Sequence, residues 1–193
     1  NNEQREIIYA ERRKVLDGGN MRDLILKMIT DIVENAVDMC ISDEQNAEKW
    51  DFKELNSLLL PIVPLEPLAY SDEIKGMKKN ELKHDLKEKA IKLYEAKEAE
   101  IGTPLMRELE RVIMLRVVDE YWMDNIDAMQ ELRQGIGLRA YGQNDPVVAY
   151  KKEGYEMFEQ MIAAIQEETL RRLFLVRIQR KAPDAPAPEI KRE

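Results

Sequence analysis

The residues that most often carry chemistry are scarce in this chain. It has one histidine, His84, and one cysteine, Cys40. A structural zinc site needs four Cys or His ligands, and a cysteine nucleophile needs a base beside it. His84 lies between two charged residues, so we interpret it as a surface residue and Cys40 as a small buried hydrophobe. The sequence therefore predicts no metal site and no thiol chemistry.

Nucleotide and carboxylate chemistry have no clear motif either. The phosphate-binding loop GxxxxGK[ST] is absent from the sequence, and Gly135, Gly137 and Gly142 do not have the spacing of GxGxxG. Acidic residues are abundant but spread along the chain, which is typical of solvated helix faces rather than of paired catalytic acids. We therefore expect no catalytic residue and no cofactor in this chain, and we predict that it is not an enzyme.

The segment from residue 132 to residue 145 is the candidate functional segment. It places Ile136, Leu138, Arg139 and Tyr141 among glycines. Exposed loops are usually small and polar, so an apolar and aromatic loop suggests a contact surface. A tyrosine ring can hold varied polypeptide without requiring one sequence. From the residues alone, Tyr141 packing back onto its own helices is an equal alternative.

Two long helices are predicted to hold this segment. The first begins at Thr103-Pro104 and is expected to end at Gly135–Gly137, because glycine favours turns. We assign Gly135, Gly137, Gly142 and Pro146 to the geometry of the loop. The second begins at Asp145-Pro146, where Asp caps the helix and Pro fits its first turn. Helices of similar length joined by a short segment form an antiparallel hairpin.

Apolar residues at helical spacing predict the buried faces of the two helices. In the first helix they fall at 105, 109, 112, 115, 118, 122, 126, 129 and 132. In the second they are Tyr155, Phe158, Ile162, Ile165, Thr169, Leu173 and Val176. Trp122 lies in the middle of the first series, so we interpret it as a core residue, with a ligand contact as the alternative.

Shorter helices are predicted before the hairpin, and the fold class is all-α. Their expected ranges are 3–16, 21–41, 51–60 and 80–100, with a capping Asn20 and an apolar loop at 60–67 that contains three prolines. Gly102 is expected to end the last of them. The first helix opens without a capping signal, which suggests a chain cut within a longer helix. The final segment, KAPDAPAPEIKRE, is predicted to be a disordered tail.

Composition narrows the function classes. The net charge is −8 over 193 residues, which disfavours a nucleic-acid binder because phosphate binding requires a basic surface. No apolar run approaches the roughly 20 residues of a membrane span, although a peripheral membrane role remains open. A single cysteine fits the reducing cytosol.

The stretch from Arg116 to Met161 resembles the SecA family. It reads RVVDEYWMDNIDAMQELRQGIGLRAYGQNDPVVAYKKEGYEMFEQM, and the motif W-M-D-x-I-D-A-M-x-x-L-R-Q-G-I-x-L-R-x-Y-x-Q-x-x-P extends from Trp122 to Pro146. The opening QREIIYAERRKVLD is similar to the end of that family's scaffold helix. Many relatives carry His where this chain has Asn125 and Gly137, so we expect a more flexible loop here.

The resemblance implies a division of the chain. Residues 1–17 would end the scaffold helix, 18–102 would form the helical wing, 103–176 the two-helix finger, and 177–193 a flexible tail. The ATPase domains, with their ATP and Mg, would lie upstream in the parent protein. The family's usual C-terminal zinc segment, rich in Cys and His, is missing from this sequence.

The resemblance also implies a function. The chain would be the mechanical, preprotein-contacting part of a motor that moves unfolded preproteins through the SecYEG channel, with Tyr141 at the fingertip and Trp122 as an alternative signal-peptide contact. Its partners would be the upstream motor domains, the channel and preproteins, and a homodimer is allowed. The location would be cytoplasmic, on the inner face of the bacterial membrane. A free-standing α-helical adaptor or chaperone is the alternative.

Overall fold

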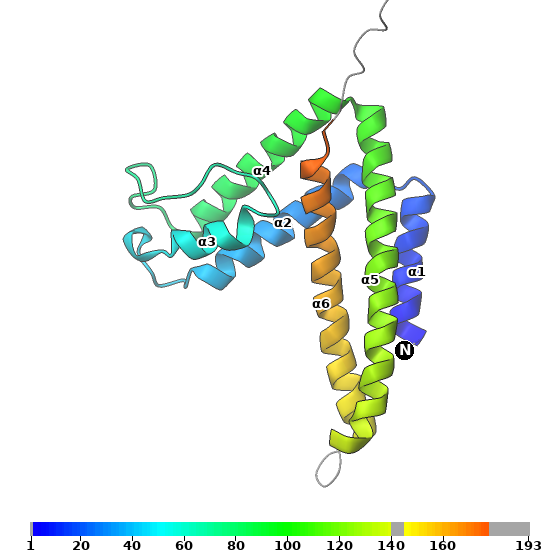
Figure 1. Cartoon of the computed structure of the whole chain (residues 1–193). Helices are drawn as coiled ribbons and strands as arrows, with labels where there is room; N and C mark the ends of the chain where they lie inside the picture. Colours follow the sequence, from blue (N-terminus) through cyan, green and yellow to red (C-terminus); the bar gives the residue numbers. More distant parts are fainter. Residues whose placement is uncertain (1, 140–144, 178–193) are drawn as a thin grey trace, which may run out of the picture.

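The computed structural model describes residues 2–139 and 145–177, and within these residues the regular secondary structure is helical, with no strand. The order is α1 (Asn2–Leu16), α2 (Met21–Cys40), a 3₁₀ turn (Ala47–Lys49), α3 (Phe52–Leu59), α4 (Lys79–Ile101), α5 (Thr103–Arg139) and α6 (Pro146–Leu175) (Figure 1). The predicted all-α class is confirmed. The predicted tail lies almost entirely outside the described residues.

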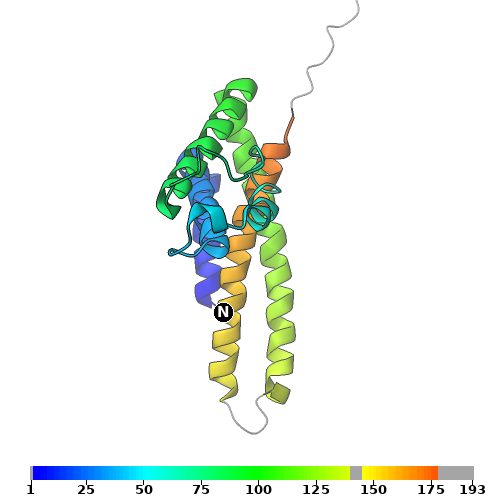
Figure 2. The same ribbon diagram turned by 90° about the vertical axis from the view of Figure 1, so that its left-hand side faces the viewer.

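The helices α5 and α6 form the predicted antiparallel hairpin, and α1 lies against one half of it (Figures 1 and 2). The Asp145 side chain accepts a hydrogen bond from the Val147 amide at 3.0 Å, and Pro146 occupies the first turn, as the sequence predicts. The Gln4 side chain of α1 donates to the Gly154 carbonyl of α6 at 3.2 Å. Among the described residues, no other helix lies beside the far half of α5 and α6 (Figure 1).

The helices α2, α3 and α4 form a lobe that projects sideways from the other end of the hairpin (Figure 1). Asn20 caps α2, as predicted, by accepting from the Asp23 amide at 3.2 Å. The Asn56 side chain makes two 2.9 Å hydrogen bonds to the backbone of Leu68, and Val63 is fully buried. The proline-containing segment is therefore an ordered apolar loop, as predicted.

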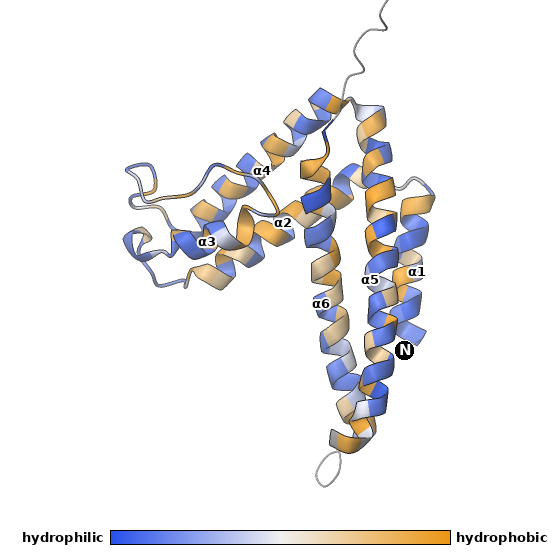
Figure 3. Cartoon of the chain, in the orientation of Figure 1, coloured by the Kyte–Doolittle hydropathy of each residue, from blue (hydrophilic) through white to orange (hydrophobic). Residues whose placement is uncertain are grey.

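Two hydrophobic clusters of different size stabilise the chain. The larger is continuous across all six α-helices, so the lobe and the adjoining half of the hairpin share one core. The smaller contains Met129, Leu132 and Ile136, with partly buried residues of α6 packed against them. Figure 3 shows the alternation of apolar and polar residues along the hairpin helices. The far half of the hairpin therefore depends on far fewer apolar contacts.

The predicted end of the first hairpin helix is wrong. Helix α5 continues through Gly135 and Gly137 to Arg139, so these two glycines lie in its last turns rather than in a loop. Glycine in a helix costs about 1 kcal/mol relative to Ala. Ile136 is buried against α6 in the smaller cluster, and this packing offsets that cost.

The predicted buried faces also need correction. Leu105 and Val112 are exposed, whereas the polar residues Glu110 and Asn125 are buried. On α6 the predicted Tyr155 is 62% exposed. The reason is that α5 is apolar nearly all round near residue 114, so contacts with α1 and the lobe, rather than periodicity, decide which face is buried.

Candidate functional site

The free end of the hairpin places the predicted contact residues in different environments. Leu138 is 84% exposed, whereas Ile136 is 7% exposed and packs in the smaller cluster. Arg139 is the last residue of α5. Tyr141 and Gly142 lie outside the described residues, so the contact role of Tyr141 stays a prediction. In this structure Ile136 supports the end of the hairpin and does not offer its side chain for contact.

The first turn of α6 adds apolar residues that sequence reasoning missed. Val147 and Val148 follow Pro146 and are both exposed, like Leu138 at the end of the facing helix. The sequence did contain a sign of this exposure. Two consecutive valines stand in the first turn of the helix, and neighbouring positions of a helix cannot both face the partner helix. The free end thus carries exposed apolar side chains on both helices, a pattern that marks interaction surfaces when the residues are contiguous.

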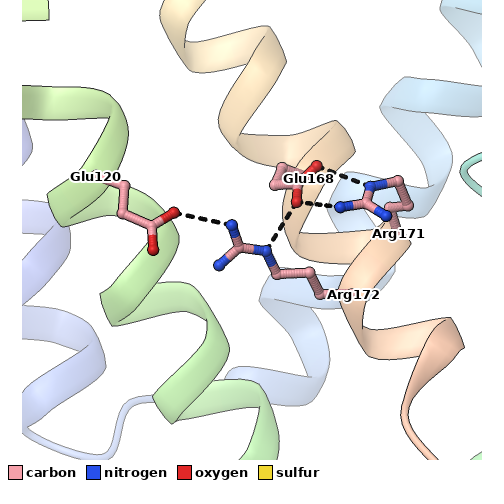
Figure 4. Close-up of polar contacts among 4 residues, drawn as sticks. All are labelled: Glu120, Glu168, Arg171 and Arg172. Carbon is pink, nitrogen blue, oxygen red and sulfur yellow. Dashed lines mark hydrogen bonds and ion pairs between the residues drawn. The ribbon is translucent and has the colours of Figure 1, made fainter. Parts of the chain in front are cut away.

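The base of the hairpin is joined by charged hydrogen bonds (Figure 4). Arg172 donates from Nε to Glu168 and from Nη2 to Glu120, both at 2.8 Å, and so connects α6 to α5. Arg171 donates from Nε to the other Glu168 oxygen at 2.8 Å. Hydrogen bonds from Arg171, with help from Arg172, lower the pKa of Glu168 to about 2. Glu168 therefore remains ionised at neutral pH and joins both guanidinium groups.

Helix α1 braces the same region. Arg12 makes a bidentate ion pair with Asp119 of α5, at 2.9 and 3.1 Å. Bidentate Arg–carboxylate pairs fix orientation as well as adding energy, although this pair is partly exposed. Together with the Gln4 hydrogen bond to α6, it holds α1 against both hairpin helices.

A buried polar cluster lies where α4 meets α5. Glu110 is fully buried, the Tyr94 hydroxyl donates to one of its oxygens, and Arg107 Nε is 3.2 Å from the other. Arg107 also pairs with Glu98 of α4. Burial raises the pKa of Glu110, and burial together with the Glu110 contact raises the pKa of Tyr94. The sequence did not predict this cluster, because a glutamate in an apolar stretch of a helix is normally expected on the exposed face.

The other residues considered in the sequence analysis, Trp122, His84 and Cys40, lie away from the free end of the hairpin. Trp122 is half-buried, packs against the larger core and lines a groove beside α1. His84 is exposed and lies 3.0 Å from Glu88, and Cys40 is half-buried. Within residues 2–139 and 145–177 no group of His, Cys, Asp or Glu is arranged to hold a metal ion.

Comparisons with known proteins agree with the resemblance seen in the sequence. The profile of the SecA Wing and Scaffold domain matches residues 1–177. The protein translocase subunit SecA of Lachnoclostridium phytofermentans is 61% identical over 196 residues, covering 94% of this chain and 21% of that protein. The same subunit of Pelotomaculum thermopropionicum is 49% identical, with 92% and 20% covered. This chain thus spans about a fifth of the length of the curated relatives it matches, and it belongs to the SecA family, in the wing and scaffold region.

Proposed function

We propose that this chain is the mechanical, preprotein-contacting module of a SecA motor. In this proposal residues 1–17 end the scaffold helix, 18–102 form the wing and 103–176 form the two-helix finger. ATP hydrolysis, with its Mg, belongs to domains upstream in the parent protein. The observation that carries the proposal is a hairpin braced at one end and carrying exposed apolar residues at the other.

The braced end supports a mechanical role. Helix α5 has 37 residues and is therefore about 55 Å long. Around its first half, α1, α6 and the lobe share one core, and the pairs at Glu120 and Asp119 add directional contacts. Close-packed interiors transmit displacement rather than absorb it. A shift applied to this braced half therefore moves the whole hairpin.

The free end supports contact with varied polypeptide. Leu138, Val147 and Val148 present aliphatic side chains, which bind apolar segments without demanding one sequence. We assign the principal contact to Tyr141, next to them along the chain, because an aromatic ring offers a large surface with few rotatable bonds. Arg139 would add a guanidinium at the same end.

The partners follow from this assignment. The finger would meet the cytoplasmic mouth of SecYEG and the unfolded preprotein, and the parent would be peripheral on the inner face of the membrane. None of the helices in the described ranges is long and apolar enough to cross a bilayer. A homodimer of the parent and signal-peptide contact near Trp122 remain parts of the proposal.

Site-specific cross-linking in the full-length parent tests this proposal. A Leu138→Cys variant, carrying a short thiol cross-linker, should react with a stalled preprotein or with the channel. The matched control is Arg116→Cys, an exposed position on the braced half of the same helix. Equal reaction at both positions, or reaction of neither, would contradict a contact surface at the free end. Binding of unfolded polypeptide by the isolated chain, with no effect of position 138, would favour the adaptor alternative.

A further inference from the structure

The lobe and the hairpin meet at a corner between α4 and α5, where only Gly102 separates the two helices. Figure 1 shows this corner at the end of the hairpin away from the start of α1. Gly102 has φ of +93°, and a Cβ there would meet no atom within 4 Å. Glycine has more accessible backbone conformations than other residues, and here no packing restricts it. Contacts away from Gly102 must therefore set the angle between α4 and α5.

Two side-chain contacts cross this corner at different distances from Gly102. The inner contact pairs Glu98 of α4 with Arg107 of α5. The outer contact is the hydrogen bond that the Tyr94 hydroxyl donates to Glu110. Tyr94 lies eight residues before Gly102 and Glu110 eight residues after it, which is a rise of about 12 Å along each helix. A contact between the far ends of two such segments fixes the angle at which the helices meet.

The two contacts are joined into one cluster. Arg107 Nε lies 3.2 Å from the Glu110 oxygen that does not accept from Tyr94. Arg22 of α2 adds a positive charge near Glu110, and it pairs with Glu95 of α4 at 3.2 Å. Groups from three helices, two in the lobe and one in the hairpin, thus converge on a single buried carboxylate.

The cluster is poorly suited to adding stability. Tyr94 and Glu110 are fully buried. Burial raises the pKa of Glu110, against the opposing effects of Tyr94, Arg107 and Arg22, so removing the carboxylate from water outweighs its attractive contacts. Buried ion pairs often stabilise a fold no more than apolar residues of similar volume.

Orientation is the property that such a cluster can specify. The lobe and the hairpin already share one continuous apolar core, and apolar contacts tolerate small changes of angle. A hydrogen bond weakens steeply when the donor, hydrogen and acceptor depart from a line. The cluster therefore favours one angle at the corner far more strongly than the core does.

We propose that the cluster of Tyr94, Glu98, Arg107 and Glu110 fixes the orientation of the lobe on the hairpin and contributes little to the stability of the fold. With the cluster intact, the lobe and the hairpin move as one body. With apolar residues in its place, both parts stay folded but adopt a range of angles. This inference does not depend on the proposed contact at the free end.

Distances between two spin labels on the full chain measure this orientation. Cys40→Ala removes the chain's single native thiol. Lys53→Cys then places one label on α3 of the lobe, and Arg116→Cys places the other on α5 of the hairpin, both at exposed positions. Glu159→Cys with Arg116→Cys is the control pair, because both labels then lie on the hairpin.

The test variant combines Tyr94→Phe, Arg107→Met and Glu110→Leu, which removes the polar groups and keeps similar side-chain volumes. We expect its distribution of lobe-to-hairpin distances to be about twice as wide as in the unchanged chain, with an equal or higher denaturant midpoint. The distance within the hairpin should not change. An equally narrow lobe-to-hairpin distribution would overturn the proposal, and so would a lower midpoint or a failure to fold.

A single hydroxyl group provides a finer test. Tyr94→Phe should widen the lobe-to-hairpin distribution, although less than the triple replacement does. Tyr121→Phe is the matched control, because Tyr121 packs against the same core from α5 but does not belong to the cluster. Equal widening by the two variants would show that the angle responds to any loss of a hydroxyl group and not to the Tyr94–Glu110 contact.

Discussion

The two ends of the α5–α6 hairpin are built differently. At the base, α1 and the lobe surround the hairpin, and apolar residues such as Leu170 and Leu173 join a core that is continuous across all six α-helices. At the free end, the described apolar residues that pack against Met129, Leu132 and Ile136 all belong to α6. The length of the two helices alone would suggest that the hairpin is equally stable from end to end. The base therefore fixes the direction of the hairpin, while the free end leaves apolar side chains exposed, as the proposed contact role requires.

The largest expected difference between the two ends is in the free energy of unfolding that is lost when a buried leucine is replaced by alanine. Leu170→Ala, at a fully buried position of the base, should lower the free energy of unfolding by about 4 kcal/mol, because a cavity remains among fixed neighbours. Leu132→Ala at the free end should cost about 2 kcal/mol, because two helices can close around the gap. Denaturant unfolding measures both values. Equal losses would remove the distinction between the two ends.

Acid should weaken the base through Glu168. Its folded pKa of about 2 lies below its ordinary value of 4.5, so its stabilisation is present above pH 4.5 and is lost as pH falls toward 2. The size is on the order of 2–3 kcal/mol. Glu168→Gln should therefore be less stable than the parent at pH 7, and the difference should vanish near pH 2. A difference that is constant with pH would show that the ionised carboxylate is not the cause.

A smaller effect is expected at the connection between the lobe and the hairpin. Gly102 has φ of +93°, a conformation that costs any residue with a Cβ. Gly102→Ala should destabilise the chain by about 1–2 kcal/mol, although a Cβ there meets no atom within 4 Å. Thermal unfolding measures the loss. A gain in stability, as expected for Ala at an ordinary helix position, would contradict the backbone argument.

The smallest effect is expected at Gly154, near the boundary between the two ends. A Cβ at this position would lie 2.8 Å from Met129 Cε, the far end of a flexible side chain. Ala is favoured over Gly in a helix by about 1 kcal/mol, and moving Met129 offsets much of this gain. Gly154→Ala should therefore change the free energy of unfolding by less than about 0.5 kcal/mol. A loss above 2 kcal/mol would mean that Met129 is held rigidly.

Local signals in the sequence predicted most helix boundaries. Asn20 and the pair Asp145-Pro146 were recognisable because capping depends on one side chain and its nearest amides. The end of α5 was not predictable from Gly135 and Gly137. Their turn preference is local, whereas the burial of Ile136 against α6 is a tertiary contact.

The candidate site was predictable in position but not in detail. A loop between two long helices must lie at the end of a hairpin, and Leu138 does lie exposed at that end, although in the last turn of α5 rather than in the loop. Buried Glu110 and Asn125 could not be recognised, because polar residues within an apolar series read as exposed positions until the partners of each face are known. The role of Tyr141, outside the described residues, still rests on the sequence and the family.

The most direct test of the proposed contact at the free end is translocation by the full-length parent carrying changes at Tyr141. Tyr141→Phe should keep most of the transport, because in the proposed contact aromatic bulk matters more than the hydroxyl. Tyr141→Ser should lose most of it while basal ATP hydrolysis persists, because hydrolysis belongs to other domains. Translocation by Tyr141→Ser at the rate of the unchanged protein would contradict a contact made by Tyr141 at the free end.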